Sequence, residues 1–139
     1  MKLENLKPIT LKLLFWSALA VWLWLLVKPS PFGDLAERLA SWYDLLPFLA
    51  AKTLHVCGYA FLTITGLASV SARWRWVMAA LVIVHAPLSE LAQYYGNLWY
   101  DTKRGGCVRD VIVDWIGVAI GLGVWLVLRR WVDSARRTV

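Results

Sequence analysis

The stretch VIVDWIGVAIGLGVWLVLRRW, residues 111–131, decides the fold of this chain. Its apolar run is interrupted near the start by Asp114 and ends at the pair Arg129 and Arg130. A helix needs roughly 20 predominantly apolar residues to cross the hydrocarbon core of a bilayer. The stretch meets that length and lacks the period-two alternation of a membrane barrel strand. It therefore predicts a membrane-spanning helix.

Three more apolar stretches precede it, at about residues 9–27, 49–70 and 76–95. Hydrophobic residues make up 60% of the 139 residues and charged residues 17%. A soluble domain is usually nearer half apolar and a quarter charged, so the composition disfavours a soluble enzyme and a disordered chain. We predict a single all-α domain built as a bundle of four transmembrane helices.

The basic residues predict the direction in which the helices cross the membrane. Cytoplasmic connections carry an excess of Lys and Arg. If the four spans alternate, nine of the 15 basic residues lie on one side, so we expect both termini in the cytoplasm. The net charge of +6 then reflects topology, and no nucleic-acid partner is predicted. These nine residues are Lys2, Lys7, Lys12, Arg73, Arg75, Arg129, Arg130, Arg136 and Arg137.

The connection between the first two spans is too long for a simple turn. Within it, DLAERLASWYDLL (residues 34–46) places Leu and Trp residues on one helical face. Asp34 and Glu37 stand in the arrangement of a capping box. We predict a short amphipathic helix lying in the outer interface. A loop packed on the bundle is the alternative.

Charged residues inside membrane spans are costly and therefore point to a site. In the second span Lys52, His55 and Tyr59 share one helical face. In the third span Glu90 and Gln93 lie one turn apart. His85, five residues before Glu90, is expected to face elsewhere as a histidine at a helix interface.

The fourth span carries a narrow stripe of Asp110, Asp114, Gly117 and Gly121. Alternating topology brings the polar residues of the three helices within about 10 Å of the outer interface. The two glycines form a small-xxx-small step, which lets a neighbouring helix approach closely. We expect this approach to draw the carboxylates toward Lys52 and its helix.

This ordered set of residues resembles the VanZ-like membrane protein family, which is named for a teicoplanin-resistance protein. The resemblance covers KTLHVCGY, SELAQ and RGGCVRDVIVDWIGVAIG, from Lys52 to Gly121. It implies that Arg104, ahead of the fourth span, belongs to the same site. One departure is Asp114, where the family usually has Asn.

The resemblance implies a multi-pass protein of the bacterial inner (cytoplasmic) membrane with a role in the cell envelope. Teicoplanin is a lipid-bearing glycopeptide antibiotic, so an effect on glycopeptide susceptibility is one expectation. The residues assigned to the ligand-binding site are Lys52, His55, Tyr59, Glu90, Gln93, Arg104, Asp110 and Asp114, with Gly117 and Gly121 assigned to helix packing.

Three interpretations of these residues remain open. In the first, Lys52 and Arg104 bind the phosphate or carboxylate of a lipid headgroup, a lipid-linked wall precursor or a lipoglycopeptide. In the second, the protein is an enzyme with His55 as general acid or base, and Glu90 or Asp114 orients it. No nucleophile motif or cofactor fingerprint supports that chemistry. In the third, the residues form a structural network that fixes helix register.

A metal site of His55, Glu90, Asp110 and Asp114 is disfavoured because the neighbouring Lys52 would repel a cation. We therefore predict no metal and no cofactor. The expected partners are membrane lipids or a lipid-linked cell-wall intermediate, and the sequence leaves a homo-oligomer open.

Overall fold

The structure is a computed structural model that describes residues 8–27, 45–100 and 107–137. In these ranges the chain is helical apart from short turns and contains no strand, so the all-α prediction is confirmed for them. The predicted interfacial helix over residues 34–46 lies outside the described residues except for its last two, which begin α3. The elements are α1 (Pro8–Val27), α3 (Leu45–Ser69), η2 (Ala72–Trp74), α4 (Arg75–Tyr100) and α5 (Val108–Arg137).

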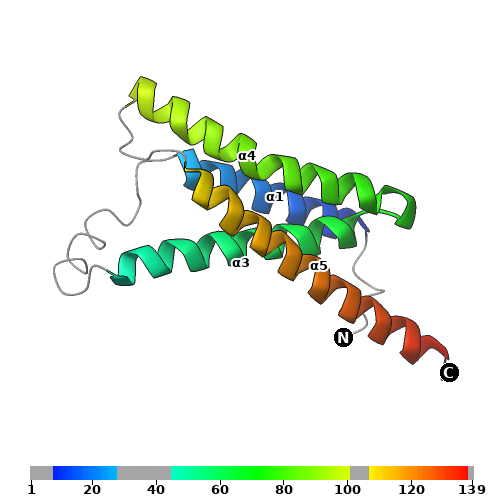
Figure 1. Cartoon of the computed structure of the whole chain (residues 1–139). Helices are drawn as coiled ribbons and strands as arrows, with labels where there is room; N and C mark the ends of the chain where they lie inside the picture. Colours follow the sequence, from blue (N-terminus) through cyan, green and yellow to red (C-terminus); the bar gives the residue numbers. More distant parts are fainter. Residues whose placement is uncertain (1–7, 28–44, 101–106, 138–139) are drawn as a thin grey trace.

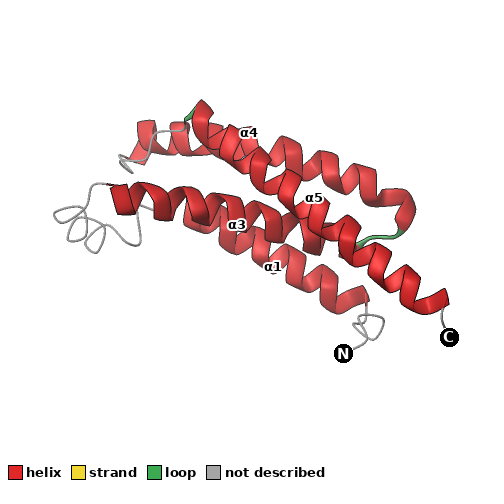
Figure 2. Cartoon of the chain, turned by 60° about the horizontal axis from the view of Figure 1, so that its bottom comes forward, coloured by secondary structure: helices red, strands yellow, loops and turns green. Residues whose placement is uncertain are grey.

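The four helices lie side by side and alternate in direction (Figures 1 and 2). α1 and α4 run one way, and α3 and α5 run the other, so α3 and α5 are parallel neighbours. We call the end where α1 and α4 finish and α3 and α5 begin the site end. Pro8 and Arg137 both lie at the opposite end, together with the turn between α3 and α4.

α3 is the central helix of the bundle, because its contacts with the other three helices are the most extensive, above all those with α5. A cluster of buried apolar side chains holds these helices together. Its members are Phe15, Trp22, Tyr59, Leu62, Leu67, Met78, Val82, Ala86 and Val118.

Two glycines explain the close contact between α3 and α5. A Cβ atom at Gly117 would lie 2.5 Å from the carbonyl oxygen of Val56, and one at Gly121 would lie 2.7 Å from that of Ala60. No larger residue fits at either position without a shift of the α3 backbone. The small-xxx-small step thus brings the two helix backbones together just beyond the aspartates of α5.

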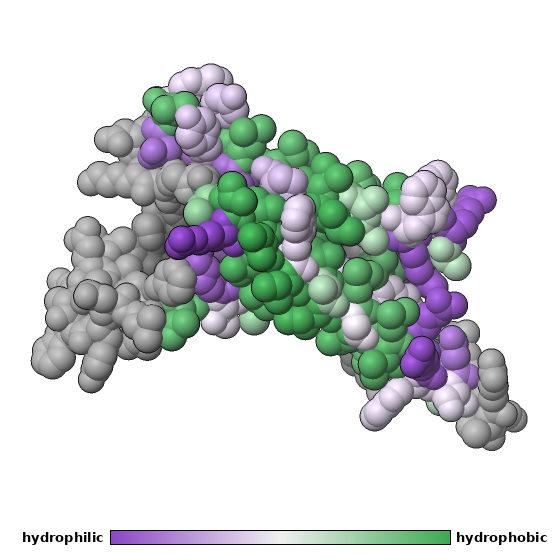
Figure 3. Space-filling model, in the orientation of Figure 1, coloured by the Kyte–Doolittle hydropathy of each residue, from purple (hydrophilic) through white to green (hydrophobic). Residues whose placement is uncertain are grey.

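The outside of the bundle is strongly apolar. Large side chains such as Leu81, Trp16 and Ile120 are exposed. Figure 3 shows hydrophobic residues over the middle of one face and hydrophilic residues toward both ends. By length and composition, Ala72–Trp99 and Val108–Ala135 are able to cross a membrane, and Ile9–Trp24 is a shorter apolar helix. An exposed apolar surface of this extent is typical of a membrane protein.

Candidate functional site

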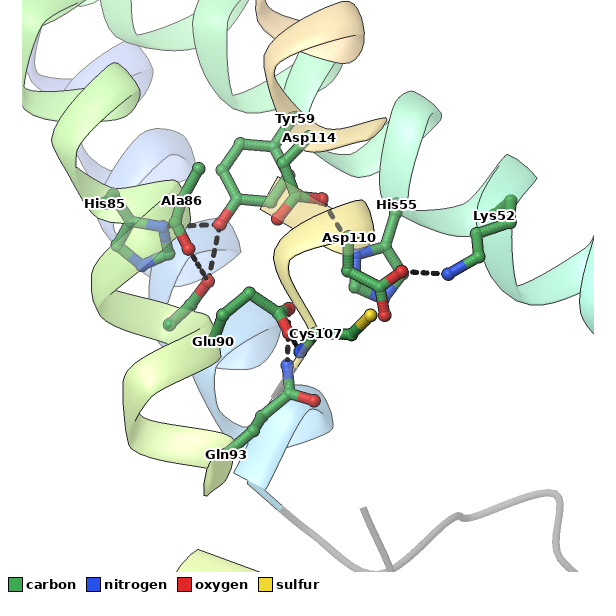
Figure 4. A network of polar contacts seen from close by, with 11 residues as sticks. Lys52, His55, Tyr59, His85, Ala86, Glu90, Gln93, Cys107, Asp110 and Asp114 are labelled. Atoms are coloured by element: carbon green, nitrogen blue, oxygen red, sulfur yellow. Dashed lines mark hydrogen bonds and ion pairs between the residues drawn. The ribbon is translucent and has the colours of Figure 1, made fainter. Parts of the chain in front are cut away.

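Polar side chains from three helices meet toward the site end of the bundle (Figure 4). They form the polar cluster, which includes most residues that the sequence assigned to a site and two that it did not, His85 and Ser89. The members are Lys52, His55 and Tyr59 of α3, His85, Ser89, Glu90 and Gln93 of α4, and Asp110 and Asp114 of α5.

Lys52 and Asp110 form an ion pair between α3 and α5 at the edge of the polar cluster. The Lys52 Nζ donates a hydrogen bond to Asp110 Oδ1. Their side chains are 23% and 18% exposed, somewhat more than the 14% of His55. The charged groups of Lys52 and Asp110 are therefore partly accessible, whereas Glu90 and Asp114 are buried.

His55 and Asp114 lie deeper in the same helix–helix contact. His55 Nδ1 lies 2.8 Å from Asp114 Oδ1, and the imidazole forms a T-shaped pair with the Trp22 ring. Asp114 is completely buried, and its Oδ2 has no hydrogen-bond partner among the described residues. The imidazole is thus oriented by a carboxylate that has one oxygen left unpaired.

Glu90 connects α4 to the start of α5. Its side chain is 4% exposed; Oε1 accepts a hydrogen bond from Gln93 Nε2 at 3.1 Å, and Oε2 accepts one from the backbone N–H of Cys107 at 2.9 Å. Cys107 is the N-cap of α5, since its carbonyl accepts the N–H of Asp110 at 2.8 Å. A carboxylate at a helix N-terminus is stabilised by the helix dipole, so Glu90 anchors the beginning of α5.

Tyr59 extends the polar cluster toward the middle of α4. Its hydroxyl lies 2.9 Å from His85 Nδ1 and 2.8 Å from Ser89 Oγ. The expectation that His85 lies at a helix interface is confirmed, because Tyr59 reaches across from α3 to contact it, whereas the expectation that it faces away from the site is wrong. His85 and Ser89 are four residues apart on one face of α4, and that spacing is the sequence signal that could have included them.

Two arginines flank the start of α5 in the sequence. Arg104, assigned through the family resemblance, lies outside the described residues. Arg109 is exposed in the first turn of α5. Among the described residues, Lys52 is the lysine or arginine that contacts a carboxylate of the polar cluster. His55 contacts the other carboxylate of α5.

The buried part of the polar cluster also has the composition of a metal site. His55, Glu90 and Asp114 come from three different helices, and each offers one ligand atom within 4.8 Å of the others. The same three groups suit acid–base chemistry, because a carboxylate-oriented imidazole can accept or donate a proton.

Comparison with known proteins gives no relative from which a function could be transferred. No family model matches the chain, and neither the curated proteins nor the solved structures contain a significant match. The function is therefore inferred from the residues and their geometry.

Proposed function

We propose that the chain is a four-span protein of the bacterial cytoplasmic membrane with both termini in the cytoplasm. The alternating helix directions and the apolar exterior support this topology. Basic residues gather at the end opposite the site: Arg75 lies over the Trp125 ring at 4.7 Å, and Arg129 pairs with Asp133 at 3.6 Å. An excess of arginines is typical of the cytoplasmic side, so the site end faces outward.

The polar cluster in this proposal binds the anionic headgroup of a lipid in the outer leaflet. The observation that carries it is the position of Lys52, which holds a partly exposed charge at the edge of a buried polar cluster confined to one end of an apolar bundle. A cation at the hydrocarbon boundary attracts a phosphate or carboxylate while the acyl chains lie along the apolar helices.

The chemical class of ligand is a lipid headgroup, a lipid-linked wall precursor or a lipoglycopeptide. The ordered residues from Lys52 to Gly121 that resemble the VanZ-like family support a cell-envelope setting and add Arg104 to the binding groups. An effect on glycopeptide susceptibility follows if the ligand is a wall precursor or the antibiotic itself.

A second candidate function is an enzyme acting on the same headgroup. The 2.8 Å contact between His55 and Asp114 favours it, because this arrangement holds an imidazole ready for proton transfer. A purely structural network is the third candidate, and it requires no ligand.

Native mass spectrometry of the detergent-purified full chain tests the binding proposal. The parent is compared with Lys52→Met and Arg104→Ala, and with Arg130→Ala as a control that removes one positive charge at the opposite end. We expect a co-purified lipid mass in the parent and the control that is lost in the other two variants. A well-folded parent without lipid, or equal lipid in all four proteins, would contradict the proposal.

The same experiment separates binding from catalysis. The lipid mass identifies the class of compound to use in a turnover assay. An enzyme would retain that lipid in His55→Ala but no longer convert it, whereas a binding protein would show no conversion even in the parent.

A further inference from the structure

We infer that His55, Glu90 and Asp114 form a binding site for one divalent transition-metal ion of the Zn²⁺ type. Each residue comes from a different helix, and one ligand atom of each lies within 4.8 Å of the others. One imidazole and two carboxylates are common zinc ligands. This metal triad, as we call the three residues, lies beside the Lys52–Asp110 pair, toward α4 (Figure 4).

The charges of the metal triad favour a dication. Glu90 and Asp114 are 4% and 0% exposed, so two carboxylates lie side by side away from water. Even a protonated His55 would balance only one of their two negative charges. Buried charges are normally paired or bound to metal, so an ion with two positive charges would complete the balance.

A second observation favours a cation beside Asp114. Asp114 is fully buried, yet its Oδ2 has no hydrogen-bond partner among the residues that the structure describes. An unpaired buried carboxylate oxygen costs free energy. The oxygens of Glu90 already accept hydrogen bonds from Gln93 and Cys107, and each still has a lone pair for a metal ion.

The objection that Lys52 repels a cation is weakened by the structure. Its ammonium group pairs with Asp110, and in Figure 4 it lies beyond Asp110 and His55 as seen from the two other carboxylates. The negative charge of Asp110 therefore reduces the repulsion between Lys52 and an ion held by His55, Glu90 and Asp114. The same pairing leaves Asp110 out of the metal triad.

The ligand types select the kind of metal ion. Mg²⁺ and Ca²⁺ prefer oxygen ligands alone, whereas an imidazole together with carboxylates suits Zn²⁺ and neighbouring transition metals. Bonds of about 2.1 Å in a tetrahedral site place ligand atoms about 3.4 Å apart. The 2.8 Å contact of His55 Nδ1 and Asp114 Oδ1 is a hydrogen bond, so the ion would replace the proton between them, which leaves to solvent, and would move the two atoms slightly apart. The Glu90 side chain has the rotatable bonds to close the remaining gap.

Three protein ligands leave a coordination position open on a zinc ion. An anionic headgroup oxygen occupying that position would make lipid binding depend on the metal. This consequence rests on the proposed function, whereas binding of the ion by the metal triad does not.

The test uses the full chain in detergent, stripped with a chelator and dialysed against ZnCl₂ alone. The exposed thiols of Cys57 and Cys107 are removed by Cys→Ser substitution so that they bind no zinc. Bound metal is then counted by elemental mass spectrometry. We expect about one zinc per chain, and a rise in Tm on zinc addition because the ion binds the folded state.

Three variants decide whether the metal triad holds the ion. Asp114→Asn and Glu90→Gln should each lower the zinc affinity at least tenfold, and the zinc-dependent rise in Tm should disappear. Asp133→Asn is the matched control, which removes an exposed carboxylate at the opposite end of α5 and should leave the affinity within twofold. If one triad variant fails to fold, the other carries the comparison.

Either of two results would overturn the inference: far less than one zinc per chain in the parent, or equal affinity in the parent and the folded triad variants. Lipid retention is measured separately on the variants of Lys52 and Arg104. A failure of zinc binding is thereby distinguished from a failure of lipid binding.

Discussion

His55 and Asp114 are 59 residues apart in the sequence and face each other across two parallel helices, with His55 Nδ1 2.8 Å from Asp114 Oδ1. Lys52 and Asp110, one turn earlier on both helices, are 58 residues apart and form an ion pair. The two contacts therefore belong to one register between α3 and α5. Any change that shifts this register would separate both pairs together.

Gly117→Ala should destabilise the bundle. The added Cβ would lie 2.5 Å from the Val56 carbonyl oxygen and 3.0 Å from Tyr59 Cβ, so the α3 backbone would have to move. Overpacking of this kind costs about 1–3 kcal/mol. Thermal unfolding in detergent, followed by circular dichroism, would show a lower Tm.

Gly123→Ala is the matched control on the same helix. No heavy atom lies within 4 Å of the added Cβ, and alanine favours a helix over glycine by about 0.5–1 kcal/mol. Its Tm should therefore rise slightly or stay unchanged. If both variants lost the same amount of stability, the effect of Gly117→Ala could not be due to the contact between α3 and α5.

Tyr59→Phe should lower the free energy of unfolding by about 1–3 kcal/mol, because the buried groups at His85 and Ser89 lose a partner. The ring and its packing against Trp22 are retained, so the change isolates the hydroxyl. Chemical or thermal unfolding in the same detergent measures the difference.

Tyr94→Phe provides the comparison for that variant. Tyr94 is 49% exposed, and loss of its hydroxyl should alter stability by less than about 0.5 kcal/mol. If Tyr59→Phe changes the free energy of unfolding equally little, the hydrogen bonds of Tyr59 to His85 and Ser89 do not contribute measurably to stability.

The outward orientation of the site end is tested with Cys107, whose thiol is exposed. In a Cys57→Ser background, a membrane-impermeant maleimide added to intact spheroplasts should label the protein, because Cys107 precedes α5 at the site end. In a chain lacking both native cysteines, Ser71→Cys at the opposite end should react only after the membrane is permeabilised. The reverse labelling pattern would invert the proposed topology.

Much of the local structure could be predicted from the sequence, because apolar runs and helical spacing act within one segment. The stretches at residues 49–70 and 76–95 correspond to α3 (Leu45–Ser69) and α4 (Arg75–Tyr100). α3 begins four residues before its predicted stretch, at Leu45, and α4 ends five residues after its predicted stretch, at Tyr100. Pro47 is tolerated in the first turn of α3, where its missing N–H has no intrahelical acceptor.

The choice of partners within the polar cluster could not be predicted. Helical spacing places Lys52 and His55 on one face of α3, but it does not say which carboxylate each contacts. The contact of His85 could not be predicted for a similar reason. Its spacing of five residues from Glu90 suggests that the two side chains point in different directions from α4. The Tyr59 side chain, which extends from α3, brings His85 into the polar cluster.

The sequence by itself determined the four apolar helical stretches, the uneven distribution of basic residues and the polar face of each helix, since these depend on neighbours along the chain. The tertiary structure decided that Lys52 pairs with Asp110, so that His55, Glu90 and Asp114 are left together. The physical reason is the register of α3 against α5. Backbone contact at Gly117 and Gly121 sets that register, and it depends on the fit of surfaces distant in the sequence.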